Sequence, residues 1–170
     1  MELIEAIRSR YSCRNYLEKA VETEKIEQIM DAARLAPSAK NFQDWRFVIV
    51  TDSNDRVKLA QAANNQMFIA KAAVIIAACS VCEEILRCGQ KISSIDLSIA
   101  IEHIALRATD LGLASCWIGS FYPDKVRSIL EIPEGVEIVE LLAVGYPADS
   151  RKEPKRLALE NIRCYDKWQF

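Results

Sequence analysis

The segment 94–111 constrains the fold of this chain more than any other part of the sequence. Apolar residues recur in it at the spacing of an α-helix, and Gly112 follows where helices often end in a capping glycine. The apolar face consists of Ile95, Ile99, Ile104, Ala108 and Leu111, widened by further apolar residues. We predict a long, broadly apolar helix at the centre of the core or at the interface of a dimer.

Shorter helices and strands alternate along the rest of the chain. We expect helices at residues 2–9, from Thr23 as N-cap until Pro37 ends the second helix, at 54–63 and at 123–130. We expect strands at residues 46–51, 72–79, 115–118 and 136–144. Because the alternation is too irregular for a repeated βαβ unit, we predict an α+β fold.

The composition is that of an ordinary globular protein. The chain has 170 residues, the size of one domain, and no linker divides residues 1–170. Its 51% of hydrophobic and 27% of charged residues exclude disorder and collagen-like structure. A formal net charge of −2 gives no reason to expect nucleic acid or a membrane as a partner.

Nothing in the sequence marks the chain for export. The N-terminus lacks the apolar core of a signal peptide, and the longest apolar stretch, residues 72–79, is too short to span a bilayer. We therefore expect a cytoplasmic protein whose six cysteines are reduced thiols. Segment 150–170 carries apolar residues that must be buried, so this tail either wraps its own domain or reaches a second subunit. They are Leu157, Leu159, Ile162, Tyr165, Trp168 and Phe170.

Two basic clusters and two polar loops stand out as candidate binding segments. Residues 10–14 bring two arginines and a serine together, and Arg is suited to bidentate phosphate binding. A second cluster consists of Arg151, Lys152, Lys155 and Arg156. Each cluster by itself is more typical of a solvated basic loop.

The two polar loops lie between the basic clusters. Loop 37–45 offers Ser, Asn and Gln side chains beside aromatic residues, a mixture that suits a planar, hydrogen-bonding ligand. Segment 116–120 ends a strand in Gly119, where a ligand can approach the backbone. Both are also typical of ordinary connections. The four segments together are what a phosphorylated aromatic cofactor needs, although their spacing does not name it.

Four sequence strings resemble the nitroreductase family in their order and spacing. They are RSRYSCRNY, LAPSAKNFQDWRF, LGLASCWIGSF and VGYPAD, the last followed by a basic residue and LALENI. The resemblance covers nearly the whole chain and is greatest to the small members of the family. It implies an α+β fold with a central mixed or antiparallel sheet flanked by helices. It also implies an intertwined homodimer, with the tail reaching the partner and two FMN sites at the subunit interface.

The resemblance also implies roles for individual residues. Arg10 and Ser12, around Tyr11, would hold the phosphate and ribityl chain of FMN. Arg14 would face the pyrimidine edge, where a cation stabilises the charge that develops on reduction. The other subunit would contribute Pro37, Ser38, Ala39 and Asn41. The residues near flavin N5 would be Trp117, Ile118 and Gly119, and those at the phosphate would include Lys155 and Arg156. One residue of Asn64, Asn65 and Gln66 would also reach the flavin, and Gln66 is taken as the candidate.

Two positions depart from the family pattern. Asp44 stands where the family often has proline, which affects the rigidity of its loop. Lys155 and Arg156 are adjacent, whereas the family usually separates its basic pair by one residue, so Lys155 is the less certain phosphate ligand.

The function implied is transfer of a hydride from NADH or NADPH to flavin N5, followed by reduction of a nitroaromatic, quinone or similar small-molecule oxidant by a ping-pong mechanism. The flavin is the reactive centre, so no catalytic side chain is required. The alternatives are a flavin-binding storage or sensor protein, and a family member that uses oxygen or a halogenated substrate. A further alternative is a thiol–disulfide protein that uses Cys79 and Cys82. A metal site at these cysteines would lack a fourth close ligand, since His103, the only histidine in the sequence, lies in the middle of a predicted helix.

Overall fold

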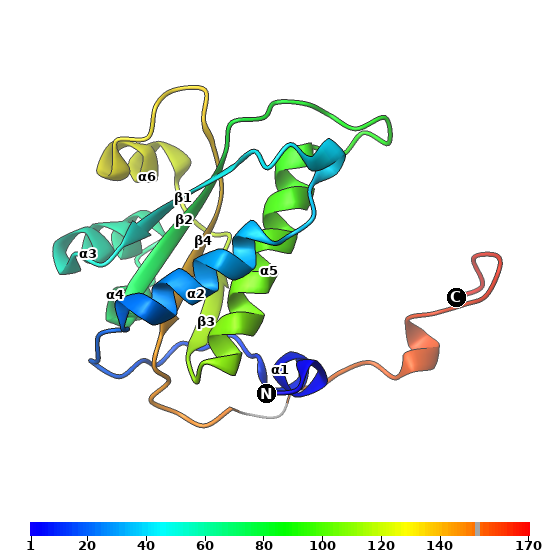
Figure 1. The fold of residues 1–170 in the computed structure, drawn as a ribbon, viewed down its shortest axis with the longest axis horizontal. Helices are drawn as coiled ribbons and strands as arrows, with labels where there is room; N and C mark the ends of the chain where they lie inside the picture. The colour runs from blue at the N-terminus through cyan, green and yellow to red at the C-terminus, as the bar shows by residue number, and fades with distance from the viewer. Residues whose placement is uncertain (152–153) are drawn as a thin grey trace.

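The computed structural model describes residues 1–151 and 154–170 of the chain. Four strands form one sheet in the order β1-β2-β4-β3, and every neighbouring pair is antiparallel. The strands are β1 (Trp45–Val50), β2 (Val74–Ser80), β3 (Ala114–Ile118) and β4 (Glu137–Gly145). Helices lie on both sides of the sheet (Figure 1), so the predicted α+β fold with a helix-flanked sheet is confirmed.

The two faces of the sheet carry separate hydrophobic clusters. All seven residues of β2 are buried, and alternate residues along it contribute to opposite clusters. One face packs against α2 (Thr23–Arg34) and α5 (Ile92–Asp110). The other packs against α3 (Ser53–Ala62), α4 (Phe68–Lys71) and α6 (Pro123–Leu130), while α1 (Leu3–Ser9) contacts α5.

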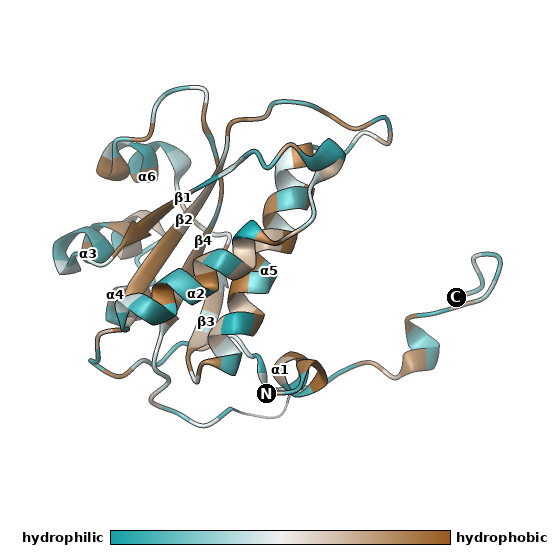
Figure 2. Ribbon diagram, viewed as in Figure 1, coloured by the Kyte–Doolittle hydropathy of each residue, from teal (hydrophilic) through white to brown (hydrophobic). Residues whose placement is uncertain are grey.

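Helix α5 is the long helix expected from the sequence. It spans 19 residues, contacts every strand and buries residues along its full length, so its place at the centre of the core is confirmed. Gly112 follows with φ of +75°. The N–H of Gly112 donates to Thr109 O at 3.1 Å and the N–H of Leu113 donates to Ala108 O at 2.8 Å, which is a Schellman cap. In Figure 2 the strands are coloured mostly as hydrophobic, whereas α5 alternates between hydrophobic and hydrophilic residues.

The predicted N-cap of the second helix is wrong by one residue. Thr23 is the first helical residue, and Glu22 is the N-cap because its carbonyl accepts the N–H groups of Lys25 and Ile26. The Glu22 carboxylate does not cap the helix. It accepts a hydrogen bond of 2.7 Å from the hydroxyl of Tyr146, a contact distant in sequence that local patterns do not reveal.

Three short helices were not expected. They are α4 and two single turns of 3-10 helix, η1 (Ala39–Asn41) and η2 (Leu159–Asn161). Because α4 ends at Lys71 with Ala72 as its C-cap, β2 begins at Val74 rather than at residue 72. Helix α6 has the expected bounds, and most of the other element bounds differ from the expected ones by one or two residues.

The C-terminal tail projects away from the body of the chain (Figure 1). Its aromatic side chains are exposed, Trp168 at 84% and Tyr165 at 72%. Trp168 packs edge-on against Phe170, with ring centroids 4.8 Å apart. The tail therefore does not wrap its own domain. In the described part of the chain, no helix is long and apolar enough to cross a bilayer.

Candidate functional site

The loop after α1 runs along the outer edge of β3. Ser12 forms a parallel bridge with Ser115, and the N–H of Cys13 donates to Ser115 O at 2.9 Å. Cys13 points into the core, where the hydroxyl of Tyr16 donates to its carbonyl at 3.0 Å. Because neighbouring residues of an extended segment point to opposite sides, Ser12 and Arg14 are held outward at the sheet edge.

Arg14 presents a cation at this edge. Its guanidinium is exposed and lies 5.9 Å from the ring centroid of Phe68. Within residues 1–151 and 154–170, no carboxylate pairs with it at ion-pair distance. Burial raises the pKa of the Cys116 thiol on β3 and Arg14 opposes that shift, so the cation lies close to this strand. Arg14 is thus available to an anionic or electron-rich ligand.

Arg10 and Tyr11 have partners within the chain. Arg10 Nε lies 3.4 Å from Glu102 Oε1, and both side chains are partly exposed. Such a pair contributes little to stability, so a phosphate can displace Glu102. The hydroxyl of Tyr11 donates to Asp149 O at 3.0 Å. Burial, with a smaller effect of Cys13, raises the pKa of Tyr11 to about 12, so its hydroxyl remains a donor at neutral pH.

The end of β3 meets the turn after α3. Ile118 is buried, whereas Gly119 is exposed and has no side chain to keep a ligand from its backbone. Asn64 Nδ2 donates to Ser120 Oγ at 2.6 Å, and Gln66 Nε2 donates to Ser120 O at 3.2 Å. The structure therefore brings Gln66 and the Gly119 backbone together, and Asn64 lies there as well.

A surface hollow of about 780 Å³ adjoins this turn. It lies between α3 and α6, and its polar lining includes Lys58, Asn64, Asn65, Tyr122 and Lys125. Lys125 Nζ is 4.6 Å from the ring centroid of Tyr122. The exposed glycine backbone is thus bordered by open space with hydrogen-bonding groups.

Sequence reasoning missed Glu140, which lies beside Gly119. A Cβ built on Gly119 would be 3.6 Å from Glu140 Oε1. Burial raises the pKa of this half-buried carboxyl to about 7. A signal existed in the sequence, because Glu140 interrupts the otherwise apolar second half of the strand 136–144.

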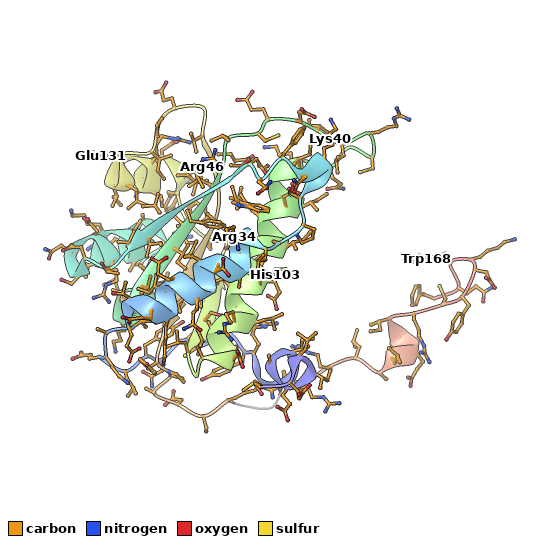
Figure 3. All side chains as sticks on the ribbon, viewed as in Figure 1. Arg34, Lys40, Arg46, His103, Glu131 and Trp168 are labelled. Atoms are coloured by element: carbon orange, nitrogen blue, oxygen red, sulfur yellow. The ribbon has the colours of Figure 1, made fainter. Side chains whose placement is uncertain are left out.

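The segment Pro37–Asn41 lies at the other end of α5. The N–H of Ala39 donates to Asp96 Oδ2 at 2.9 Å, and Ser38 Oγ accepts the N–H of Gln43 at 3.1 Å. Lys40 has φ of +50° and lies at the end of α5 remote from α1 (Figure 3). Within one chain, this segment is therefore not brought together with Arg14.

Asp44 occupies the position where proline was noted as usual. Its carboxylate is buried and accepts a hydrogen bond from Ser80 Oγ, which in turn accepts the N–H of Cys82 at 3.0 Å. The loop is thus fixed by a hydrogen-bond network rather than by a proline ring.

Arg151, Lys155 and Arg156 of the second basic cluster are exposed. Lys152 lies outside the described residues, and Lys155 and Arg156 follow on the tail. Where the structure describes the chain, neither residue pairs with a carboxylate. Trp117 is half-buried on the face of β3 that packs toward α5.

The cysteine pair is poorly placed for thiol chemistry. Cys79 is buried on β2, and burial raises its pKa to about 11, which disfavours the reactive thiolate. His103 Nδ1 lies 3.2 Å from Ala32 O, so the ring packs between α5 and α2. Across the described ranges, no group of three His, Cys, Asp or Glu side chains is placed to hold a metal ion.

Known proteins resemble this chain along almost its full length. A family model described as the nitroreductase family matches residues 7–84 and 87–146. A relative from Archaeoglobus fulgidus, named as a candidate NADH dehydrogenase/NAD(P)H nitroreductase, is 32% identical over 161 residues, which is 88% of each chain. A nitroreductase family protein from Clostridium difficile 630 has a TM-score of 0.89 and 34% identity, and the match covers 99% of this chain and 100% of that chain. An FMN-dependent nitroreductase from Clostridium difficile R20291 has a TM-score of 0.85 and 26% identity over 96% and 99% of the two chains.

Proposed function

This chain belongs to the nitroreductase family, and from that premise we propose that it is an FMN-dependent oxidoreductase with NADH or NADPH as its electron donor. The observation that carries the proposal is the Arg14 cation at the edge of β3, which forms no ion pair with any carboxylate that the structure describes. It lies on the same strand edge as Ser12 and near the exposed end of that strand. Relatives of similar length are named as FMN-dependent or NAD(P)H-dependent enzymes, which supports the same cofactor and donor here.

The residues at this edge fit FMN. Arg14 and Ser12 offer a cation and a hydroxyl, Gln66 offers an amide, and Gly119 offers backbone without a side chain. Ser115 Oγ is buried beneath this loop and has no hydrogen-bond partner among the described atoms. Bound FMN would supply two-electron chemistry at N5. Arg10 would exchange Glu102 for the phosphate, and Arg14 would oppose the negative charge that accompanies reduction.

The acceptor is proposed to be a nitroaromatic, a quinone or a similar small oxidant. The exposed glycine is bordered by the hollow beside Asn64, and donor and oxidant would occupy this open space in turn. That order of events gives ping-pong kinetics. The chain's residues need only bind, orient and exclude water, because no nucleophilic side chain takes part.

A homodimer is proposed to complete the site in the cytoplasm. Loop Pro37–Asn41 is held at the opposite end of α5 from α1, so a second copy would supply it to the Arg14 edge. An apolar groove on α1 and α5, lined in part by Leu3, His103 and Leu106, lies open in the single chain. The exposed tail of a second copy, with Lys155 and Arg156 at its start, would cover such apolar surface.

The decisive experiment is a visible spectrum of the purified protein, followed by anaerobic addition of NADH or NADPH. We expect a flavin spectrum that is bleached by at least one donor. Arg14→Ala should lose FMN, whereas Arg34→Ala should not, since Arg34 lies on the surface of α2 paired with Asp31 at 2.7 Å. A colourless protein that does not quench FMN fluorescence would refute the proposal.

Further outcomes separate the alternatives. Bound FMN that neither nucleotide reduces would indicate a storage or sensor protein. Oxygen uptake or halide release during turnover would indicate a member that uses oxygen or a halogenated substrate. Loss of activity with unchanged flavin content in a Cys79→Ser, Cys82→Ser double variant would indicate thiol chemistry instead.

A further inference from the structure

Glu140 is a half-buried acidic side chain on β4, next to the fully buried second half of that strand. It pairs with Ala78 of β2, next to a register shift between Ala78 and Cys79. Its neighbour Leu141 pairs with Ile118, the last residue of β3. The carboxyl therefore lies against the strand end, with Oε1 and Oε2 3.6 and 3.7 Å from the position of a Cβ on Gly119.

One oxygen of this carboxyl has no partner. Glu140 Oε1 is buried and accepts no hydrogen bond from any described atom. An unsatisfied buried oxygen costs free energy, and a native structure rarely keeps one without a use. Burial raises the pKa of Glu140 to about 7, although the backbone N–H groups of Ile118 and Leu141 oppose the shift. The carboxyl therefore changes protonation near neutral pH.

No charge on the surrounding elements dominates this carboxyl. On β3, Cys116 is the titratable neighbour, and Glu140 contributes to the rise of its pKa. On β2, the pKa of Cys79 is raised by burial without a contribution from Glu140. On α5, which packs on β4, the buried carboxyl is Asp96, whose pKa responds to burial and to Asp44 instead. In the described part of the chain, no cation forms an ion pair with Glu140.

We propose that Glu140 exchanges a proton beside Gly119 when the cofactor of the site is reduced and reoxidised. The proposal rests on the proposed function, in which Gly119 faces flavin N5. Hydride transfer delivers two electrons and one proton, and so leaves one additional negative charge in the site. The Glu140 carboxylate compensates by binding a proton from water. On reoxidation, when the hydride equivalent leaves with the acceptor, the carboxyl returns its proton to the acceptor or to water.

Two measurements test this role, and Glu137 supplies the matched control. Glu137 lies on the same strand, but its carboxylate binds Lys91 Nζ and Ser93 Oγ, each at 2.7 Å, and those contacts lower its pKa. The first measurement follows the side-chain carboxyl ¹³C signals of labelled glutamates against pH, without FMN, with FMN and with reduced FMN. The second follows the midpoint potential of bound FMN against pH in the wild type, Glu140→Gln and Glu137→Gln.

We expect one carboxyl signal, lost in Glu140→Gln, to titrate near neutral pH without FMN and at higher pH when bound FMN is reduced. The ratio of affinities for reduced and oxidised FMN should change about tenfold across this titration, which is ~30 mV for a two-electron couple. Glu140→Gln should remove this dependence and Glu137→Gln should keep it.

The same titration in oxidised and reduced protein, or an unchanged pH dependence in Glu140→Gln, would overturn the role of Glu140 alone. A protein that binds no FMN would overturn the proposed function together with this inference.

Discussion

Asp96 on α5 and Glu140 on β4 each place a carboxyl oxygen inside the protein, and the chain uses the two groups differently. Asp96 is buried to 2% exposure, and one of its oxygens accepts the N–H of Ala39 at 2.9 Å. Glu140, at the strand end beside Gly119, leaves Oε1 without a donor. Asp96 therefore positions a loop, whereas Oε1 of Glu140 contributes no hydrogen bond to the fold. A buried carboxyl oxygen without a structural partner is the better candidate for chemistry.

The largest effect is expected in a mixed dimer, which tests whether the loop held by Asp96 and the Arg14 edge beside Gly119 come from different subunits. We expect Arg14→Ala to prevent FMN binding by disabling one half of the site. A Ser38→Ala, Asn41→Ala double variant should prevent binding by disabling the other half. If the halves come from different subunits, a mixed dimer of the two variants contains one fully intact site. Flavin content should then rise from near zero in each homodimer to about one FMN per two chains in the purified mixed dimer. A mixed dimer without FMN would show that both halves belong to one chain, or that the loop is not needed.

The positioning role of Asp96 predicts the next largest effect. Asp96→Leu leaves the N–H of Ala39 without its acceptor, which should destabilise the fold by about 1–3 kcal/mol. Asp96→Asn keeps an oxygen acceptor and should recover most of this loss. Urea unfolding of the two variants measures the difference, and equal stabilities would show that the Ala39 contact is not what Asp96 contributes.

Replacing Glu140 should stabilise the folded chain, whereas replacing Asp96 should destabilise it. Its pKa is raised from 4.5 to about 7 in the folded chain, so the folded state binds the proton more tightly. The stabilising contribution of the protonated carboxyl is fully present below pH 4.5 and is lost as the pH rises to 7. Because the group is only half-buried, Glu140→Gln should be more stable than the wild type by about 1–2 kcal/mol above neutral pH.

The measurement is thermal or urea unfolding at several pH values from acid to mildly alkaline. The wild type and Glu140→Gln should converge at the acid end. A constant difference across the whole range would mean that the carboxyl does not titrate as its burial requires.

The smallest effect is expected from the Arg10–Glu102 pair. Both side chains are partly exposed, so Glu102→Gln should change stability by less than about 1 kcal/mol. Because Glu102 competes with a phosphate for Arg10, the same variant should bind FMN slightly more tightly. Equilibrium titration with FMN and with riboflavin, which lacks the phosphate, checks this, since only FMN binding should respond.

Local sequence signals predicted the elements that depend on local chemistry. Helix α5 was expected from its periodicity and from Gly112, because a Schellman cap needs a residue with positive φ. The four-residue helix α4 was missed, since so short a helix is formed by its packing rather than by its own periodicity.

The site residues also divide into those that the sequence identified and one that it did not. Ser12, Gln66 and Gly119 were named from the family resemblance, and the chain brings them to one edge of the sheet. Glu140 was missed because a glutamate within a predicted strand is typical of a solvent-facing position. The register shift between β2 and β4 changes which residues face the interior there, and nothing in the local pattern marks it. The proposed contributions of a second copy involve contacts that one chain does not contain.

The exposed tail also has a consequence for the kinetics of folding. Leu157, Tyr165 and Trp168 stay in water as long as the chain is alone, because the rest of the chain does not cover them. If another copy covers them, the last step of folding is bimolecular, and its rate rises with the concentration of chains. A freshly synthesised chain then passes through a period in which residues 154–170 are the segment most accessible to proteases. This period is longer when expression is low, because a lower concentration of chains slows their association.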